Sequence, residues 1–269
     1  MYIENLQYFC GAFREVTMQI QNNTYMQTTL FPINGWQQIC DDYYVAAPVK
    51  RTFSFFTAPL TNSVPSLELS MQEFFYIISG RAFFMNNHEL KSLAQRTFSH
   101  WKHYQTLQEH YAHGKCSLDE LCRFKKYGFD YVTIAGVFKL RRAYDCLATR
   151  SAYIMLNFNE LTDVEDVFGR LQNDTFLKPL LLYRSMNNGI VAIVNITVFN
   201  QSYYSLVREL NAYIATEYHQ TIFNPRIAQY TCPTFVTYDP QAWLSPNVLA
   251  ESEANLTGPR RETSMLLAA

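Results

Sequence analysis

Two asparagines, Asn157 and Asn159, follow an apolar run in the sequence YIMLNFNELTD, residues 153–163. Side chains alternate along a strand, so two carboxylates at these positions would share one face and could bind a pair of metal ions. Amides bring no charge, and Mg²⁺ sites normally rely on one or two carboxylates together with substrate phosphates. The stretch therefore has the spacing of a metal-binding pair without its charge.

Residues 100–122 hold a second group of possible metal ligands. It comprises four of the six histidines and two of the six cysteines: His100, His103, His110, His113, Cys116 and Cys122. Both neighbouring histidine pairs have one-turn spacing, which can place two imidazoles on one helix face for zinc. The overall order, H-x2-H-x6-H-x2-H-x2-C-x5-C, matches no standard zinc module. A solvated helix face is the favoured interpretation, and a zinc site is the alternative.

Basic residues cluster weakly in two places. The first cluster is Arg123, Lys125 and Lys126, and the second is Lys139, Arg141, Arg142 and Arg150. The second cluster follows a strand candidate that would neighbour the asparagine pair, so it is the better candidate for contact with nucleic-acid phosphates. The alternative is a solvated loop, which is the usual role of a charge run.

The composition is that of a folded globular protein. Of 269 residues, 48% are hydrophobic and 17% are charged, against a typical charged share of roughly a quarter. The net charge of −1 gives no global field for nucleic acid or an anionic membrane. Scattered cysteines, an N-terminus without a basic leader region and the absence of an apolar run of roughly twenty residues predict a soluble cytoplasmic protein.

Helix boundaries are marked by capping residues. Three pairs have capping-box spacing: Ser70 with Glu73, Ser117 with Glu120, and Thr162 with Glu165. Gly80 and Gly128 stand where the first two of these helices would end. A helix-rich stretch is expected from 86 to 127, and a long helix over 200–219.

Strands are expected mainly in the second half of the chain. The candidates are DYVTIAGVF (130–138), SAYIMLNF (151–158), an antiparallel pair around MNN (179–185 and 189–199), and a short strand within 232–246. The order of elements predicts an α+β fold, with an antiparallel or mixed sheet and helices on one face. Residues 1–51 are expected to be an extension or accessory subdomain, 52–246 the main domain, and 247–269 a polar tail.

The ordered series of these segments resembles a known family. FSFFTAPLTNSVPSLELSMQEFFYIISG, FDYVTIAGVF, SAYIMLNFNEL, LKPLLLYRSMNNGIVAIVNI and FNPRIAQYTCPTFVTYDPQAWLSP are similar to the primase-like N-terminal domain of Bacteroidetes VirE-type and helicase-associated proteins. That family is a divergent branch of the archaeo-eukaryotic primase (primase-polymerase) superfamily. The resemblance covers about residues 52–246. It implies an RRM-like palm and, in active relatives, two-metal nucleotidyl transfer that uses Mg²⁺ or Mn²⁺.

The motif positions of that family are neutral in this chain at all but one place. An Asp-x-Asp pair corresponds to Asn157 and Asn159. A serine- and glycine-containing motif followed by a basic residue corresponds to Ser185, Gly189 and Val191. A last motif with Asp, Arg and Asp-Pro corresponds to Asn224, Cys232 and Asp239. The resemblance therefore implies a degenerate member, for which no catalytic residue and no cofactor are expected.

Three functions remain open from the sequence. The first is an inactive primase-like domain that binds nucleic acid, such as single-stranded DNA, or a replication or mobile-element protein. The second is an active primase-polymerase-type enzyme with unusual metal ligands. The third is a protein-interaction module with no nucleic-acid role. None of them involves a membrane.

Overall fold

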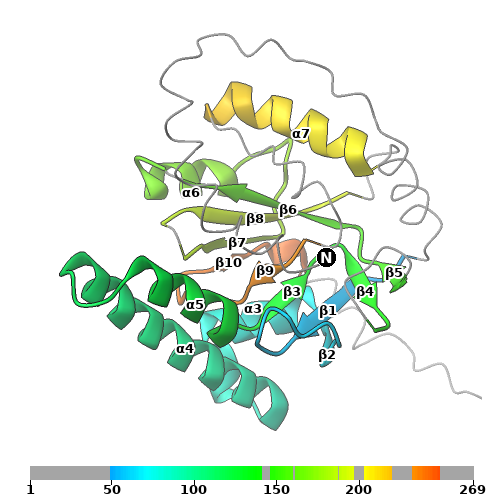
Figure 1. The fold of residues 1–269 in the computed structure, drawn as a ribbon. Helices are drawn as coiled ribbons and strands as arrows, with labels where there is room; N and C mark the ends of the chain where they lie inside the picture. Colours follow the sequence, from blue (N-terminus) through cyan, green and yellow to red (C-terminus); the bar gives the residue numbers. More distant parts are fainter. Residues whose placement is uncertain are drawn as a thin grey trace, which may run out of the picture.

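The computed structural model of the protein describes residues 49–140, 146–159, 161–186, 188–196, 203–219 and 232–248. These residues form two four-stranded antiparallel sheets, a two-stranded ribbon and the helices that cover them (Figure 1). The fold is α+β, as predicted. The predicted N-terminal extension up to residue 48, the tail from residue 249, and three site candidates, Arg141, Arg142 and Asn224, lie outside the described residues.

The first sheet has the strand order β2-β1-β3-β9. Its strands are β1 (Thr52–Phe56), β2 (Leu67–Ser70), β3 (Tyr131–Thr133) and β9 (Thr234–Phe235). Alternation along β1 places Phe53 and Phe55 in the core between the two sheets. Phe56 points to the other face, where its ring stacks on Tyr131.

The second sheet has the strand order β10-β7-β8-β6. Its strands are β6 (Tyr153–Phe158), β7 (Leu181–Arg184), β8 (Ile190–Asn195) and β10 (Trp243–Leu244). Strands β7 and β8 form the antiparallel pair that the sequence predicts around residues 186–188. The three longer strands are almost continuously apolar because both faces of this sheet are buried.

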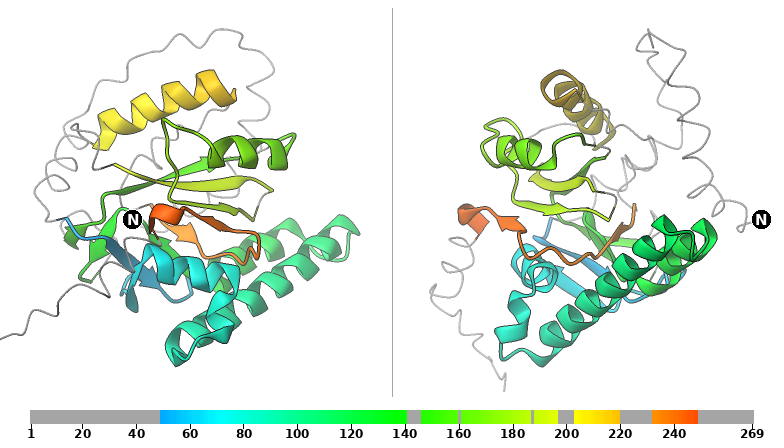
Figure 2. Two further views of the ribbon diagram at one scale, coloured as in Figure 1. Left: turned by 180° about the vertical axis from the view of Figure 1, so that it is seen from behind. Right: turned by 90° about the vertical axis from the view of Figure 1, so that its left-hand side faces the viewer.

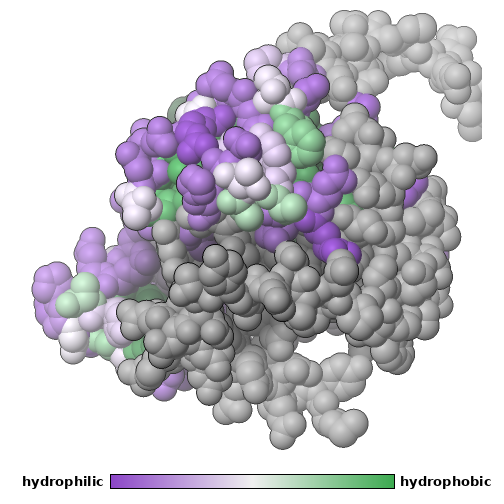
Figure 3. Space-filling view, turned by 90° about the horizontal axis from the view of Figure 1, so that it is seen from above, coloured by the Kyte–Doolittle hydropathy of each residue, from purple (hydrophilic) through white to green (hydrophobic). Residues whose placement is uncertain are grey.

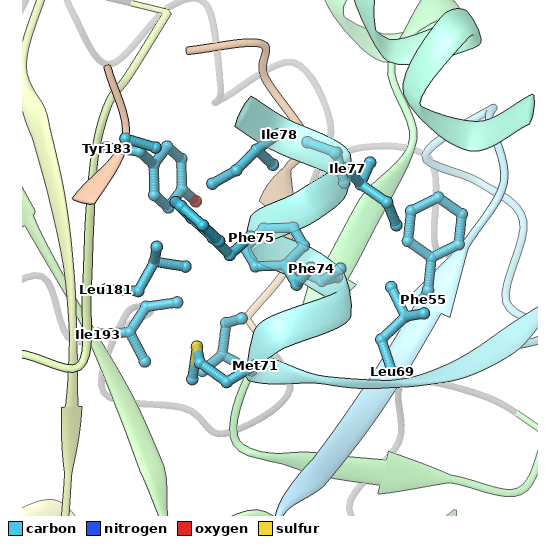
Figure 4. Close-up of a cluster of buried hydrophobic side chains, with 14 of the residues drawn as sticks. Phe55, Leu69, Met71, Phe74, Phe75, Ile77, Ile78, Leu181, Tyr183 and Ile193 are labelled. Atoms are coloured by element: carbon cyan, nitrogen blue, oxygen red, sulfur yellow. The ribbon is translucent and has the colours of Figure 1, made fainter. Parts of the chain in front are cut away.

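Helix α3 (Met71–Ser79) fills the space between the two sheets (Figure 4). The ring of Phe74 meets Phe53 of the first sheet edge-on at 5.6 Å and Tyr183 of the second at 6.0 Å. The predicted capping box of Ser70 and Glu73 is present at its start, and Gly80 ends it in the left-handed conformation, with φ 76°. One short amphipathic helix therefore joins the two sheets into a single core.

The opposite face of the second sheet is covered by α6 (Val164–Gln172) and α7 (Tyr203–Tyr218) (Figure 2). The hydroxyls of Tyr213 and Tyr218 donate to one oxygen of Asp174, at 3.0 and 2.6 Å, which fastens α7 to the segment after α6. Seen from above, the described surface is mainly hydrophilic with small hydrophobic groups (Figure 3). Helices thus cover both faces of this sheet, and not one face as the sequence predicted.

Helices α4 (His88–Ala112) and α5 (Leu118–Gly128) form a hairpin beside the first sheet, and the short 3-10 helix η2 (Arg81–Phe84) leads into it. The predicted capping box of Ser117 and Glu120 starts α5. Gly128 is the last residue of α5, not a left-handed glycine beyond it, since the chain continues directly into extended Phe129. No helix in the described ranges has the length and apolar character needed to cross a membrane.

Two further predictions need correction. DYVTIAGVF is not one strand, because the chain turns at Ile134 and Ala135, so that β3 joins the first sheet while β4 (Gly136–Phe138) pairs with β5 (Leu147–Arg150). Helix α6 is capped by Asp163, whose carboxylate accepts from the Asp166 amide at 3.0 Å, and not by Thr162. A carboxylate next to the first turn also interacts favourably with the helix dipole.

The Tyr183 hydroxyl is buried in the core without a hydrogen-bond partner among the described residues. Burial alone raises its pKa far above the ordinary value. We expect Tyr183→Phe to raise the free energy of unfolding by about 1 kcal/mol, since an unpaired buried hydroxyl is costly. Tyr131→Phe is the matched control, because the equally buried Tyr131 hydroxyl donates to the Asn62 carbonyl. Chemical denaturation should show that Tyr131→Phe lowers the free energy of unfolding. Equal effects of the two variants would contradict the statement that the Tyr183 hydroxyl is unpaired.

Candidate functional site

The candidate site lies at the end of the second sheet where β6 and β7 finish and β8 begins. In the turn between β7 and β8, the Ser185 amide donates to the Gly189 carbonyl at 2.8 Å, and the Gly189 amide donates to Ser185 Oγ at 3.2 Å. The register pairs Asn157 with Val191 and Phe158 with Ile190. The fold therefore brings together five of the predicted site positions: Asn157, Asn159, Ser185, Gly189 and Val191.

Gly189 is required by the close approach of the two strands. A Cβ at this position would lie 3.1 Å from Ser185 Oγ and 3.2 Å from the Asn159 Cα. It would also lie much closer to the Phe158 carbonyl oxygen than the 3.0 Å that real Cβ atoms keep from other atoms. Gly189 lies at the end of the β7–β8 turn and is also in close contact with the end of β6. The absence of a side chain at residue 189 is what allows Asn159 to lie beside Ser185.

Asn157 and Asn159 differ in their surroundings. Alternation puts Asn157 on the same face as Tyr153 and Met155, toward the space between the two sheets, and it is half-buried at the open end of that face. Asn159 follows the last residue of β6 and is exposed. Val191, opposite Asn157, is 3% exposed and packs in the intersheet core, so a cation at this position would be buried.

Asp239 is buried, and its carboxylate is fully engaged. One oxygen accepts from the Arg184 amide at 2.7 Å, and the other accepts from the Gln241 amide at 3.0 Å and lies 3.5 Å from the Arg184 guanidinium. The Asp239 amide donates to the Ile78 carbonyl at the end of α3 at 2.8 Å. Asp239 therefore ties the segment before β10 to β7 and α3.

Arg184, which the sequence did not single out, is the charged centre of this sheet end. Its guanidinium binds both oxygens of Glu165 at 2.7 Å and lies 4.9 Å from the centre of the Phe168 ring. Burial lowers the pKa of Arg184, but Glu165 and Asp239 outweigh this effect and raise the pKa above its usual value. In the sequence, the available signal for Arg184 was an arginine at the end of a strand candidate that follows the predicted helix with Glu165.

The described side chains at this sheet end do not fit a two-metal site. The amide oxygens of Asn157 and Asn159 carry no charge, and hard divalent cations depend on carboxylates. The nearby acids that the structure describes serve other partners: Asp239 and Glu165 bind Arg184, and Asp163 caps α6. Ser185 Oγ, which accepts from Gly189, adds a neutral hydroxyl. The donor set suits hydrogen bonding with neutral polar groups.

Cys232 is half-buried and lies two residues before the start of β9. In β9, the Thr234 hydroxyl contacts the Met155 sulfur of β6. Strand β9 belongs to the first sheet, so this contact links the edges of both sheets.

Two members of the predicted phosphate-binding cluster, Lys139 and Arg150, lie in the part of the chain that the structure describes. Lys139 is exposed after β4, and Arg150 ends β5, just before the chain enters β6. The six-residue strand spans roughly 17 Å between that end and the asparagine pair. These described members of the cluster are therefore not part of the sheet end that holds Asn157 and Asn159.

The histidines and cysteines of 100–122 contact other groups. His103 and His100 pack against the Phe124 ring, with centroids 4.6 and 6.5 Å apart. The His113 ring contacts the Glu109 carbonyl of its own helix, and Cys116 donates to the Leu107 carbonyl. Within the described ranges, no group of three or more His, Cys, Asp or Glu side chains is arranged to hold a metal ion.

The chain was also compared with known proteins. No family model, no curated protein and no solved structure matches it.

Proposed function

We propose that this protein is a catalytically inactive, primase-like palm domain that binds nucleic acid. The observation that carries the proposal is the grouping of Asn157, Asn159, Ser185 and Gly189 at one sheet end, where two neighbouring carboxylates that the structure describes, Asp239 and Glu165, are bound to Arg184. These are the positions that the family resemblance assigns to metal binding and nucleotide contact. The packing around Gly189 keeps the strand ends close, while the side chains lack the charge that the chemistry uses.

The uncharged side chains at the motif positions of this sheet end favour binding over nucleotidyl transfer. Two-metal transfer requires anionic ligands that hold both cations while the attacking and leaving oxygens are stabilised. Asparagine and serine side chains donate and accept hydrogen bonds instead, and these interactions suit bases and sugars. A role in replication or in a mobile element follows from the resemblance alone and belongs to the proposal.

Restoring the carboxylates tests this proposal directly. We expect Asn157→Asp/Asn159→Asp to gain saturable Mn²⁺ binding, measured by electron paramagnetic resonance of free Mn²⁺, whereas the natural chain shows none at millimolar Mn²⁺. The reason is that two adjacent carboxylates supply the charge that a hard cation requires. Without metal, the double variant should also be less stable, because like charges lie close together.

The matched control is Gln105→Glu/Gln108→Glu, which adds two negative charges on α4, one helical turn apart. It should leave Mn²⁺ binding as weak as in the natural chain. Saturable Mn²⁺ binding by the natural chain, equal to that of the aspartate variant, would contradict the proposal and favour an enzyme with unusual ligands.

A further inference from the structure

The α4–α5 hairpin carries a local excess of positive charge. Over residues 90–108 and 121–129 the chain has no Asp or Glu and six cations: Lys91, Arg96, Lys102, Arg123, Lys125 and Lys126. Arg96 is paired with Asp130. Within the described ranges, Lys102, Arg123 and Lys126 form no ion pair. A chain of net charge −1 therefore has a basic stretch on this hairpin, with four acids, Glu89, Glu109, Asp119 and Glu120, near the helix ends.

Rings lie beside the cations where α4 meets α5. The His103 ring is tilted by 32° against the Phe124 ring, with the centroids 4.6 Å apart, and Tyr127 is 57% exposed one turn further along α5. Arg123, Lys126 and Tyr127 have the i, i+3, i+4 spacing that places them on one helix face. We name this surface the α4–α5 seam; it comprises His103, Arg123, Phe124, Lys126 and Tyr127.

The hairpin that carries the seam packs directly against the candidate site. Tyr104 of α4 and Leu121 of α5 share a buried cluster with Phe129 and Met186, and Met186 is next to Ser185 in the β7–β8 turn. In Figure 1, the hairpin and α6 lie on opposite sides of the end of the second sheet. The hairpin and the sheet end that holds the asparagine pair are therefore neighbours.

We propose that the α4–α5 seam binds single-stranded nucleic acid. Arg123 and Lys126 contact phosphates, and the rings of Tyr127 and His103 stack on bases. Exposed rings interleaved with cations are the combination that binds single strands with little sequence preference, because every base has a face to stack. An acidic protein would use the cations but not the rings. The inference rests on the proposed nucleic-acid role and assigns it to a surface different from the Lys139–Arg150 cluster.

The test is fluorescence anisotropy with a labelled oligothymidylate strand, using the full chain at several NaCl concentrations. Arg123→Ala/Lys126→Ala should weaken binding about tenfold and reduce the slope of log affinity against log salt by about 1.4, since each neutralised phosphate contributes about 0.7 for a single strand. Tyr127→Ala should weaken binding about fivefold with an unchanged salt slope, because it removes stacking and no charge. An oligouridylate strand tests whether the seam distinguishes DNA from RNA.

The matched control is Lys91→Ala/Lys102→Ala, which removes the same charge from α4 instead of α5. Lys91 and Lys102 are eleven residues apart, or about three helical turns, so they lie on one stripe of α4. Lys102 lies over the Phe98 ring, which packs on Phe83 and Tyr238 and not on α5. Equal weakening by both double variants, or an unchanged affinity of the seam variants, would overturn the seam assignment while leaving the proposed function intact. Failure of the natural chain to bind either strand, or tighter binding of polyglutamate, would overturn the nucleic-acid role itself.

Discussion

Gly189→Ala is expected to destabilise the protein by about 3 kcal/mol, the upper part of the range for overpacked sites. The added methyl would collide with the backbone carbonyl of Phe158, which cannot rotate away as a side chain could. Relief requires β8 to move from β6, and this movement would disturb the pairing of Asn157 with Val191. Thermal unfolding should show a Tm lower by roughly 10 °C.

Gly169→Ala is the matched control for this substitution. Gly169 lies within α6, and no atom lies within 4 Å of the position that its Cβ would take. Alanine in a helix interior is better than glycine by about 0.5–1 kcal/mol, so this variant should be stabilised. The same glycine-to-alanine change should thus stabilise the protein at residue 169 and destabilise it at residue 189. A Gly189→Ala protein as stable as the natural chain would show that β6 and β8 are not packed as described.

Asp130→Ala is expected to cost about 2 kcal/mol, because it removes a buried carboxylate that accepts from two donors, while the partly exposed Arg96 can regain water. The Asp130 side chain accepts from the Ala58 amide and from Arg96 Nε, both at 2.8 Å, and thereby joins the loop after β1 to α4. Without it, the Ala58 amide and the Arg96 guanidinium lose their partner. The measurement is urea denaturation of both proteins.

Asp119→Ala provides the comparison on the same hairpin. Asp119 is exposed in the first turn of α5, where a carboxylate contributes at most about 1 kcal/mol through the helix dipole. A second test replaces both partners, as Arg96→Met/Asp130→Asn, which should be more stable than the sum of the single changes predicts. If Asp130→Ala lowers the free energy of unfolding no more than Asp119→Ala does, the ion pair contributes little to stability.

The sequence predicted features that depend on local chemistry. The Ser70–Glu73 and Ser117–Glu120 capping boxes, the left-handed Gly80 and the β7–β8 hairpin all follow from residues close together in the chain. The spacing of Asn157 and Asn159 also identified the strand end correctly as part of β6 and the residue after it. Short-range hydrogen bonds and side-chain alternation decide these features, and both can be read from neighbouring letters.

The remaining features depend on contacts between distant segments. Nothing near Ile134 distinguishes one long strand from two strands in different sheets, because the choice is made by pairing with β1 and β5. The position of α3 between two sheets depends on apolar faces from both of them. Arg184 and Asp239 are 55 residues apart, so their contact at the sheet end gives no local signal. The isolation of Lys139 and Arg150 from Asn157 likewise results from the direction in which β6 runs.

The central claim is that the chain binds nucleic acid without transferring nucleotides. One reaction tests it most directly: the natural protein is mixed with a labelled primer on a longer template, Mn²⁺ and all four nucleotides, and the same sample is resolved on native and denaturing gels. We predict a retarded complex in which the primer keeps its original length. A lengthened primer would contradict the loss of catalysis, and an unretarded strand would contradict the binding role.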